Sequence, residues 1–356
     1  MKKILVIVVA FQAAIIAFLI FWKSENPARS LVFAPSPTPA PKPLLKYTYD
    51  NLKNYTPQSS DVKIEQTLKE DEKDDFVSYL FNFYIKDGRK VSGLMNVPKK
   101  TGKYPMMLLI RGYVDPSVYE TGIGSQHVGE FFAQNGFITL APDYLGYGSS
   151  DKPSKDGFED RFLTYITTMD LLESFPNVSK ALEDYDVKGV SADSDKIGIW
   201  AHSNGGQIAL TVAELRGFDY PMVLWAPVSK PFPYSILFYT DEYNDDGKAM
   251  RKAVADFESI YDAQKYSLTE HLDWINSPIQ IHQGISDIEV PENWSSEFVE
   301  KLEKADKKVE YFTYPGENHN FQNGSWPTAV LRSMEFVRKN LKIEKPELTI
   351  TMTPNL

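Results

Sequence analysis

One serine of this chain stands in a context that can turn a hydroxyl group into a nucleophile. Ser203 follows the short apolar run 197–202 and precedes Gly205, Gly206 and a helix-like segment. Small residues let a strand and a helix approach closely around a sharp turn, and such a turn holds its serine strained and accessible. Ala201 stands where glycine is usual in this pattern. The context indicates a nucleophilic serine, and the alternative is a glycine-rich turn with a solvated serine.

A nucleophilic serine needs a base that accepts its proton. The chain has five histidines: His127, His202, His271, His282 and His319. In the strand–turn–helix arrangement around a nucleophilic serine, the chain order is serine, then acid, then histidine. His127 and His202 precede the serine, His271 lies in a polar stretch, and His282 lies within an apolar run. We therefore expect His319, in a turn-rich loop after the strand-like run 309–314, to be the base.

The acid that orients the base should lie between the serine and the histidine. Residues 278–283 form an apolar, strand-like run, and Gly284 follows it. Asp287 and Glu289 come next and compete for the role, although either could be a solvated or helix-capping acid. Asp287 lies nearer the glycine turn, so we expect it, rather than Glu289, to be the acid.

These segments share motifs with a known family. The acid segment reads G-x-x-D-x-x-V-P around Asp287, and the histidine segment reads P-G-E-x-H-x-F around His319. Together with the turn at Ser203, they resemble the catalytic domain of the prolyl oligopeptidase family of serine peptidases, within the α/β-hydrolase superfamily. The resemblance covers residues 87–341. It implies a serine hydrolase that cleaves acyl bonds, and it is less specific for the substrate.

Acyl transfer also needs fixed backbone donors for the tetrahedral oxyanion. We expect one donor to be the N–H of Asn204, directly after the nucleophile. The second should be the N–H of Tyr113, which follows the apolar run 104–110 and the pair Arg111-Gly112. Arg111 stands where the resemblance leads one to expect histidine. Tyr113 could alternatively be a plain packing residue.

The remaining pattern predicts a mostly parallel central sheet with helices on both faces, and the resemblance implies an α/β-hydrolase fold with a small cap insertion. A hairpin over residues 76–97 precedes alternating strand-like and helix-like runs, which is typical of such a sheet. Ligands of these sheets bind beyond the carboxyl ends of the strands, where Ser203, Asp287 and His319 should all lie. The repeats of about 40–50 residues that mark a β-propeller are absent from the sequence.

The stretch 231–274 is the expected cap. It carries aromatic residues that could contact a substrate: Phe232, Tyr234, Phe238 and Tyr239. The alternative is that these rings pack the cap onto the core.

The N-terminal part divides into segments. Residues 1–3 should be a cytoplasmic stub and residues 4–22 a transmembrane anchor, because that uncharged run is close to the length that crosses a bilayer. We expect a proline-rich linker over residues 23–60, a catalytic domain over residues 61–343 and a tail over residues 344–356. The catalytic domain should be extracytoplasmic, and the alternative is a secreted protein with a cleaved signal.

Composition narrows the function further. The net charge of −10 argues against nucleic-acid binding, and the lack of cysteine excludes disulfides and thiolate chemistry. No metal motif or cofactor fingerprint is present, so we expect neither. The sequence predicts a membrane-anchored serine hydrolase that cleaves acyl bonds, peptide or ester, and the resemblance implies a peptidase acting on short peptides. The alternatives are a carboxylesterase acting on small or lipid-derived esters and, in a different class, a non-catalytic binding module.

Overall fold

The computed structural model describes residues 41–242 and 244–344, and Pro43 begins a compact unit. The expected stub, the expected anchor at 4–22 and the tail from residue 345 lie outside the described residues. Within the described part, no helix combines the length and the apolar character needed to cross a membrane.

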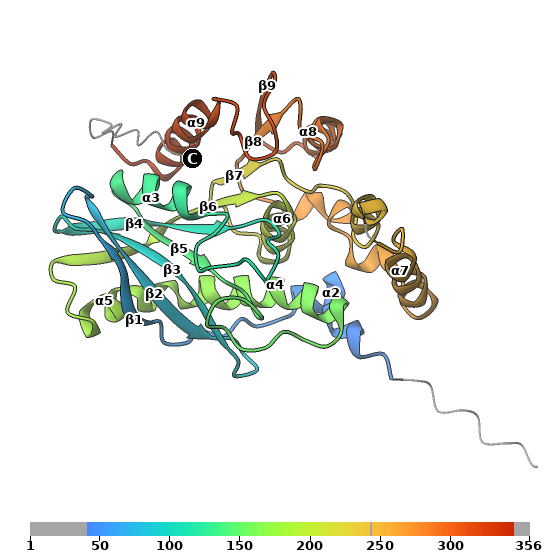
Figure 1. Ribbon diagram of the computed structural model, residues 1–356, viewed down its shortest axis with the longest axis horizontal. Helices are drawn as coiled ribbons and strands as arrows, with labels where there is room; N and C mark the ends of the chain where they lie inside the picture. Colours follow the sequence, from blue (N-terminus) through green and yellow to red (C-terminus); the bar gives the residue numbers. More distant parts are fainter. Residues whose placement is uncertain (1–40, 243, 345–356) are drawn as a thin grey trace, which may run out of the picture. The chain divides into compact units, whose positions relative to one another are not determined.

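A single nine-stranded sheet forms the centre of the unit (Figure 1). Its strands follow the spatial order β1-β2-β3-β5-β4-β6-β7-β8-β9, and β4 to β9 are parallel to one another. The strands are β1 (Lys63–Glu70), β2 (Phe76–Tyr84), β3 (Lys90–Pro98), β4 (Gly102–Ile110), β5 (Ile138–Pro142), β6 (Val190–His202), β7 (Met222–Trp225), β8 (Ile279–Gly284) and β9 (Val309–Tyr314). The predicted mostly parallel sheet is confirmed.

The predicted hairpin is also confirmed. Strands β2 and β3 pair antiparallel from Phe76 opposite Pro98 to Tyr84 opposite Lys90. Gly88 lies in the connecting turn with φ at 86°, a conformation that glycine adopts without a steric penalty. The hairpin extends the sheet on the side away from β9.

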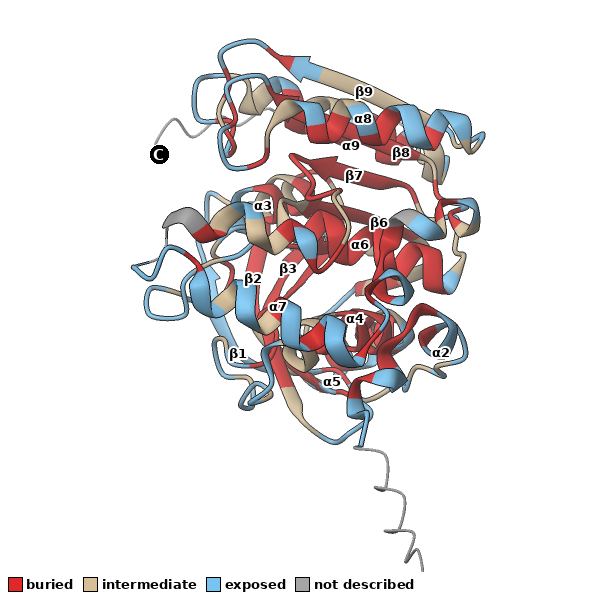
Figure 2. Ribbon diagram, turned by 90° about the vertical axis from the view of Figure 1, so that its right-hand side faces the viewer, coloured by how far each residue is buried: buried red, intermediate tan, exposed pale blue. Residues whose placement is uncertain are grey.

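Helices cover both faces of the sheet, and the buried residues concentrate between the helices and the strands (Figure 2). Residues of α3 and α9 pack with one face, and residues of α4, α5, α6 and α8 pack with the other. The helices are α2 (Tyr49–Lys53), α3 (Gln126–Gln134), α4 (Gly157–Ser174), α5 (Val178–Asp184), α6 (Asn204–Arg216), α7 (Lys248–Ile260), α8 (Glu292–Lys304) and α9 (Trp326–Leu341).

The helical region between β5 and β6 is divided. It comprises α4 and α5, which a 3₁₀ turn over Phe175–Asn177 separates. Pro176 explains the break, because proline has no N–H to donate within a helix and its ring clashes with the preceding turn.

The N-terminal boundary of the folded unit differs from the expected linker. Residues 43–60 pack on the catalytic unit instead of forming a spacer: a 3₁₀ helix (Pro43–Tyr47) leads into α2, and Leu44, Tyr49 and Leu52 are buried. The Tyr55 hydroxyl donates to Oδ1 of Asp170 on α4 at 2.8 Å. The alternating prolines end at residue 43, and the apolar side chains after them supply enough buried surface to hold the segment in place.

Candidate active site

Ser203 occupies the turn between β6 and α6. Its φ of 56° and ψ of −125° differ from both helix and strand, and such backbone strain concentrates at functional positions. Gly205 makes the turn possible, because a Cβ atom there would lie 2.1 Å from the carbonyl oxygen of Ile110 at the end of β4. The Ser203 N–H donates to the Trp225 carbonyl oxygen at 2.9 Å, which fixes the turn to β7.

His319 and Asp287 lie together, although 32 residues separate them in the chain. His319 Nδ1 is 2.8 Å from Asp287 Oδ2, and both side chains are buried. An ionised carboxylate only accepts hydrogen bonds, so this contact places the proton on Nδ1 and leaves Nε2 able to accept one.

The Asp287 carboxylate is held from several directions. Its Oδ1 accepts the backbone N–H groups of Glu289 at 2.9 Å and Val290 at 2.8 Å, and its Oδ2 accepts Gln283 Nε2 at 3.1 Å. Ser295 in turn donates to Gln283 Oε1 at 2.7 Å. These bonds satisfy a buried charge and fix its direction toward the imidazole.

His202, directly before Ser203, contacts the His319 loop. Its Nε2 is 3.0 Å from the backbone oxygen of His319, and the two rings are 4.5 Å apart. Burial, followed by the charge of His319, lowers the pKa of His202 to about 3. His202 is therefore a neutral donor that joins the serine turn to the histidine loop, a role that sequence order alone did not indicate.

Glu317 organises the same loop. Its side chain is buried and accepts the backbone N–H groups of Asn323 at 2.6 Å and Ser325 at 2.8 Å. Glu317 belongs to the P-G-E-x-H-x-F pattern, which was the available sequence signal, but its contacts depend on the folded loop.

The segment after β4 borders the serine. A Cβ atom on Gly112 would lie 2.9 Å from Ser203 Cβ, so only glycine fits at this approach. Tyr113 follows with a 71% exposed side chain, which argues against the packing alternative. Asn204 begins α6, and its Oδ1 accepts Arg161 Nη1 at 2.6 Å.

The Arg111 side chain supports the segment after β4. The buried guanidinium donates to the carbonyl oxygens of Gly112 at 2.9 Å and Asp143 at 2.8 Å. It also lies over the rings of Tyr119, at 4.5 Å, and Tyr147, at 4.1 Å. Arginine thus supports the loop where the resemblance led us to expect histidine.

Comparison with known proteins shows to which family the chain belongs. A profile of the prolyl oligopeptidase family matches residues 125–344, most of the chain. The chain belongs to the prolyl oligopeptidase family. It is 28% identical over 248 residues to the uncharacterized peptidase YtmA of Bacillus subtilis, an alignment that covers 67% of this chain and 84% of YtmA.

Solved structures agree on the α/β-hydrolase fold. Acetyl xylan esterase 1 of Thermoanaerobacterium has a TM-score of 0.55 and 14% identity, over 84% of this chain and 94% of that one. A puromycin-hydrolyzing peptidase of Mycobacterium tuberculosis has a TM-score of 0.54 and 19% identity, over 75% of this chain and 40% of that one. The prolyl oligopeptidase family member described here is a serine hydrolase, and both peptidase and esterase activity fit these relatives.

The expected pocket residues of this family member lie in different surroundings. Phe232 is buried, with its ring 5.3 Å from that of Phe162 and 5.9 Å from that of Phe158. It therefore packs the stretch 231–274 onto the core, as the alternative interpretation stated. The exposed Tyr234 donates to Glu258 on α7. Neither of these two side chains has a described contact with the Asp287 loop.

Phe238 and Tyr239 instead lie on the side of the Asp287 loop. Phe238 is 46% exposed, and its ring is 4.9 Å from that of Trp294 on α8. Tyr239 packs against the cluster that contains Val290 and Trp294. These two aromatic residues remain candidates for substrate contact.

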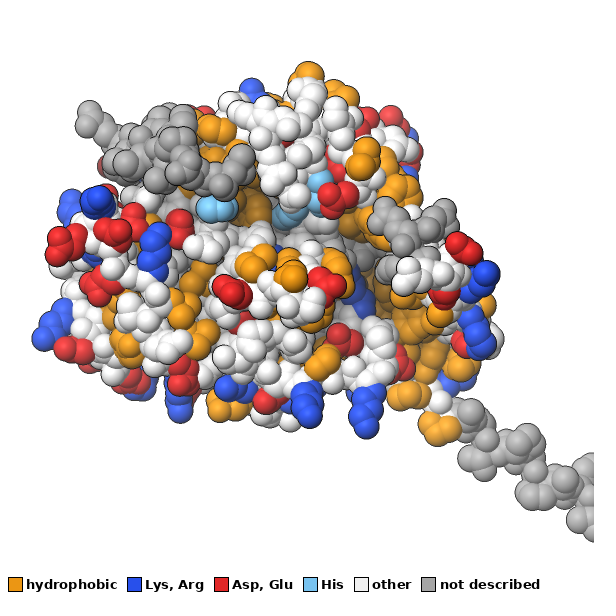
Figure 3. All heavy atoms as spheres, in the orientation of Figure 1, with side chains coloured by type: hydrophobic (Ala, Val, Ile, Leu, Met, Phe, Trp, Pro, Cys, Tyr) orange, Lys and Arg blue, Asp and Glu red, His pale blue; other side chains and the backbone are white. Residues whose placement is uncertain are grey.

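The other histidines of the prolyl oligopeptidase family member have different roles. His282 is buried on β8 and bonds to the Tyr314 hydroxyl at 2.7 Å and Gln280 Oε1 at 2.9 Å. His271 stacks between Tyr49, at 5.1 Å, and Trp274, at 4.0 Å. His127 is exposed on α3. Figure 3 shows histidine side chains on one face, with hydrophobic side chains and an acidic one near them.

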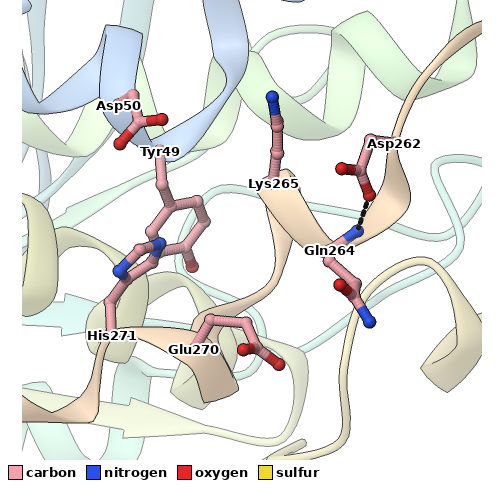
Figure 4. A pocket seen from close by; sticks show the side chains of 7 residues that line it. All are labelled: Tyr49, Asp50, Asp262, Gln264, Lys265, Glu270 and His271. Carbon is pink, nitrogen blue, oxygen red and sulfur yellow. Dashed lines mark hydrogen bonds between the residues drawn. The ribbon is translucent and has the colours of Figure 1, made fainter.

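A hollow of about 240 Å³ lies where the N-terminal segment meets the residues after α7 (Figure 4). Its lining comprises Tyr49, Asp50, Asp262, Gln264, Lys265, Glu270 and His271. None of these residues belongs to the Ser203 site. In the described ranges, no group of three or more histidine or acidic side chains could hold a metal ion.

Proposed function

We propose that Ser203, Asp287 and His319 form a catalytic triad that hydrolyses acyl bonds through an acyl-enzyme. The observation that carries the proposal is the 2.8 Å contact between His319 Nδ1 and Asp287 Oδ2, together with the strained backbone of Ser203. His202 supports the arrangement, since it joins the residue before Ser203 to the His319 loop.

In this mechanism, His319 Nε2 accepts the proton from the Ser203 hydroxyl as its oxygen attacks the substrate carbonyl. Asp287 keeps the Nδ1 proton in place and stabilises the imidazolium that forms. The imidazolium then donates its Nε2 proton to the leaving group, and the acyl group stays on Ser203. Water, activated by the same histidine, releases the acid and restores the serine.

The developing oxyanion needs donors beside Ser203. We assign the N–H groups of Tyr113 and Asn204 to this role. The close approach of Gly112 to Ser203 supports the assignment of Tyr113, and Asn204 follows the nucleophile directly. One donor of this kind contributes about 3–4 kcal/mol to transition-state stabilisation.

The bond cleaved is proposed to be a peptide bond in a short substrate, as the family membership suggests. A carboxylesterase is the second candidate, because the described residues contain no propeller that would enclose a peptide above the strand ends. The acetyl xylan esterase that shares the fold over 94% of its length supports keeping this candidate.

We also propose that residues 4–22 anchor the enzyme in a membrane, with the catalytic unit outside the cytoplasm. The uncharged run after Lys2-Lys3 and the prolines before residue 43 support this arrangement. Fractionation of cells that express the whole chain, compared with a chain beginning at residue 43, tests it. Membrane recovery of both forms would contradict the proposal.

The enzymatic proposal is tested with the purified catalytic unit and matched panels of p-nitrophenyl esters and aminoacyl p-nitroanilides. We expect hydrolysis of at least one panel, and the faster panel identifies the bond. Ser203→Ala should lower kcat by about 10⁴-fold or more. Hydrolysis at an equal rate by the variant would contradict the triad, and no hydrolysis of either panel would favour the binding module.

A further inference from the structure

We propose that Glu289, together with the aromatic rings beside it, forms a subsite for a cationic group of the substrate. The inference rests on the proposed function and adds the substrate class: acyl compounds with an ammonium group close to the scissile bond. From the sequence, Glu289 was only the less favoured candidate for the acid that orients His319. The structure gives it a different position, on the outer side of His319.

The Glu289 carboxylate faces the reacting nitrogen. Its Oε2 lies 3.8 Å from His319 Nε2, whereas Asp287 contacts the opposite ring nitrogen. The Glu289 side chain is 60% exposed, so a substrate in the site can reach it. Within the described part of the chain, no lysine or arginine forms an ion pair with it. Its charge is therefore available to a ligand.

The loop that carries Glu289 is fixed. The backbone N–H of Glu289 donates to Asp287 Oδ1 at 2.9 Å, and the backbone N–H of Val290 donates to the same atom at 2.8 Å. Val290 is buried in a small cluster with Trp294. The carboxylate therefore extends from an ordered backbone, and a ligand meets it without ordering the loop first.

Aromatic rings lie on the cap side of this carboxylate. The rings of Phe238 and Tyr239 lie 4.9 Å and 6.4 Å from that of Trp294. Burial first, and then the carboxylates of Asp287 and Glu289, raise the pKa of the Tyr239 hydroxyl, which therefore stays uncharged. Ring faces attract cations, and a carboxylate beside them strengthens that preference.

The ammonium group of Lys230 already lies near one of these rings, that of Trp294. Lys230 Nζ lies 6.0 Å from the centre of the Trp294 ring and pairs with Glu297. Phe238 keeps 46% of its surface exposed and remains accessible to a ligand.

A positive charge lies at the start of the helix that follows the serine. The Arg161 guanidinium donates to the side-chain oxygens of Asn204 and Gln207, next to the nucleophile. Both acceptors are neutral amides, so the positive charge of Arg161 is not neutralised by them. A substrate ammonium group is repelled from the Arg161 side and attracted to the Glu289 side. The site is therefore electrostatically asymmetric, with a positive charge near Asn204 and a negative charge near His319.

The experiment uses pairs of related substrates, of which one member carries a positive charge and the other is neutral. In the acyl arm, alanine p-nitroanilide is compared with N-acetylalanine p-nitroanilide. In the leaving-group arm, acetylcholine is compared with 3,3-dimethylbutyl acetate, its neutral isostere. The measured quantity is the ratio of kcat/KM for the cationic and the neutral member of each pair. The arm with the larger ratio shows on which side of the bond the cation binds.

We expect the wild-type enzyme to favour the cationic member in at least one arm. Glu289→Gln should lower that ratio about three- to fivefold, the scale of an exposed ion pair. Glu289→Lys should lower it further, because it places a like charge at the subsite. The matched control is Asp184→Asn, which removes one exposed charge on α5 and should leave every ratio unchanged.

Equal ratios in wild type and Glu289→Gln would overturn the inference, as would an equal fall in Asp184→Asn. A failure of the proposed function is distinguishable, because a fluorophosphonate probe would then leave Ser203 unmodified in the wild-type enzyme. Labelling of Ser203 without a charge preference overturns only the cation subsite.

Discussion

At the scale of single residues, the carboxylates of Asp287 and Glu289 lie on the same loop but contact opposite nitrogens of His319. Asp287 is buried and bonds to Nδ1, whereas Glu289 is largely exposed and lies 3.8 Å from Nε2. Burial and the backbone donors to Asp287 make it the group that fixes the histidine tautomer. The two acids therefore have separable effects on catalysis.

We predict that Asp287→Asn lowers kcat/KM on a neutral substrate by about 10⁴-fold, because the amide favours the wrong histidine tautomer. Glu289→Gln should cause a far smaller loss on the same substrate. Steady-state kinetics of both variants, on whichever ester or anilide is hydrolysed fastest, makes the comparison. A severe loss in Glu289→Gln with a mild one in Asp287→Asn would reverse the assignment of the acid.

The turn at Ser203 and the contact between Asp287 and His319 could be predicted from the sequence, because chain order and strand ends restrict each choice. His202 and Arg111 could not be assigned in the same way. His202 acts through the backbone oxygen of a residue 117 positions away, and Arg111 through the carbonyl of Asp143. Such partners become neighbours only in the folded chain, so local sequence does not reveal them.

At the scale of elements, the loop after β4 depends on Arg111. We predict that Arg111→Lys lowers kcat by about 10²-fold with little change in KM, because the role proposed for the Tyr113 N–H is in the transition state. A lysine cannot donate to the Gly112 and Asp143 carbonyl oxygens in the fork geometry of a guanidinium. Separate measurement of kcat and KM tests this. A rise in KM at constant kcat would indicate a role in substrate binding instead.

The N-terminal segment provides a second prediction at this scale. Leu52→Ala should lower the free energy of unfolding by about 2–5 kcal/mol, because it leaves a cavity beneath α2. Leu45→Ala, at a side chain that is 44% exposed, is the matched control and should have little effect. Denaturant unfolding of both variants measures the difference. Equal stability would show that the segment contributes little to the fold.

Sequence patterns predicted several strands well, because runs of apolar residues bounded by turn residues mark strands locally. The hairpin and the strands at 279–284 and 309–314 all follow that pattern. The linker boundary was misjudged, because the segment 43–60 is short and its few apolar side chains show no regular spacing. Their burial depends on the surfaces of α4 and α6 that receive them, and no local pattern encodes those surfaces.

At the scale of the whole molecule, two neutral histidines make the fold sensitive to acid. Burial, and then the charge of Arg332, lowers the pKa of His282 to about 3, and His202 has a similarly lowered pKa. An unfolded histidine binds a proton below about pH 6.5. Between about pH 3 and about pH 6.5, the pKa values of the folded and unfolded histidines, the unfolded state binds more protons than the folded state. Stability therefore falls as the pH falls through this range.

We predict that stability decreases by about 2 kcal/mol between pH 7 and pH 5 through His282 alone, at roughly 1.4 kcal/mol per pH unit below 6.5. His282→Gln should remove that part of the pH dependence, whatever its effect at pH 7. His127→Gln, which removes an exposed histidine, is the control. Urea unfolding at both pH values gives the slope, and an unchanged slope in His282→Gln would contradict the buried, neutral state.

The whole arrangement depends on Ser203 as the nucleophile, and covalent labelling tests this most directly. The purified enzyme is treated with a fluorophosphonate probe, digested, and its modified peptide identified by mass spectrometry. The triad predicts one adduct on Ser203, absent in Ser203→Ala and formed much more slowly in Asp287→Asn. An adduct on another residue, or equal labelling of Ser203→Ala, would contradict the proposed catalytic site.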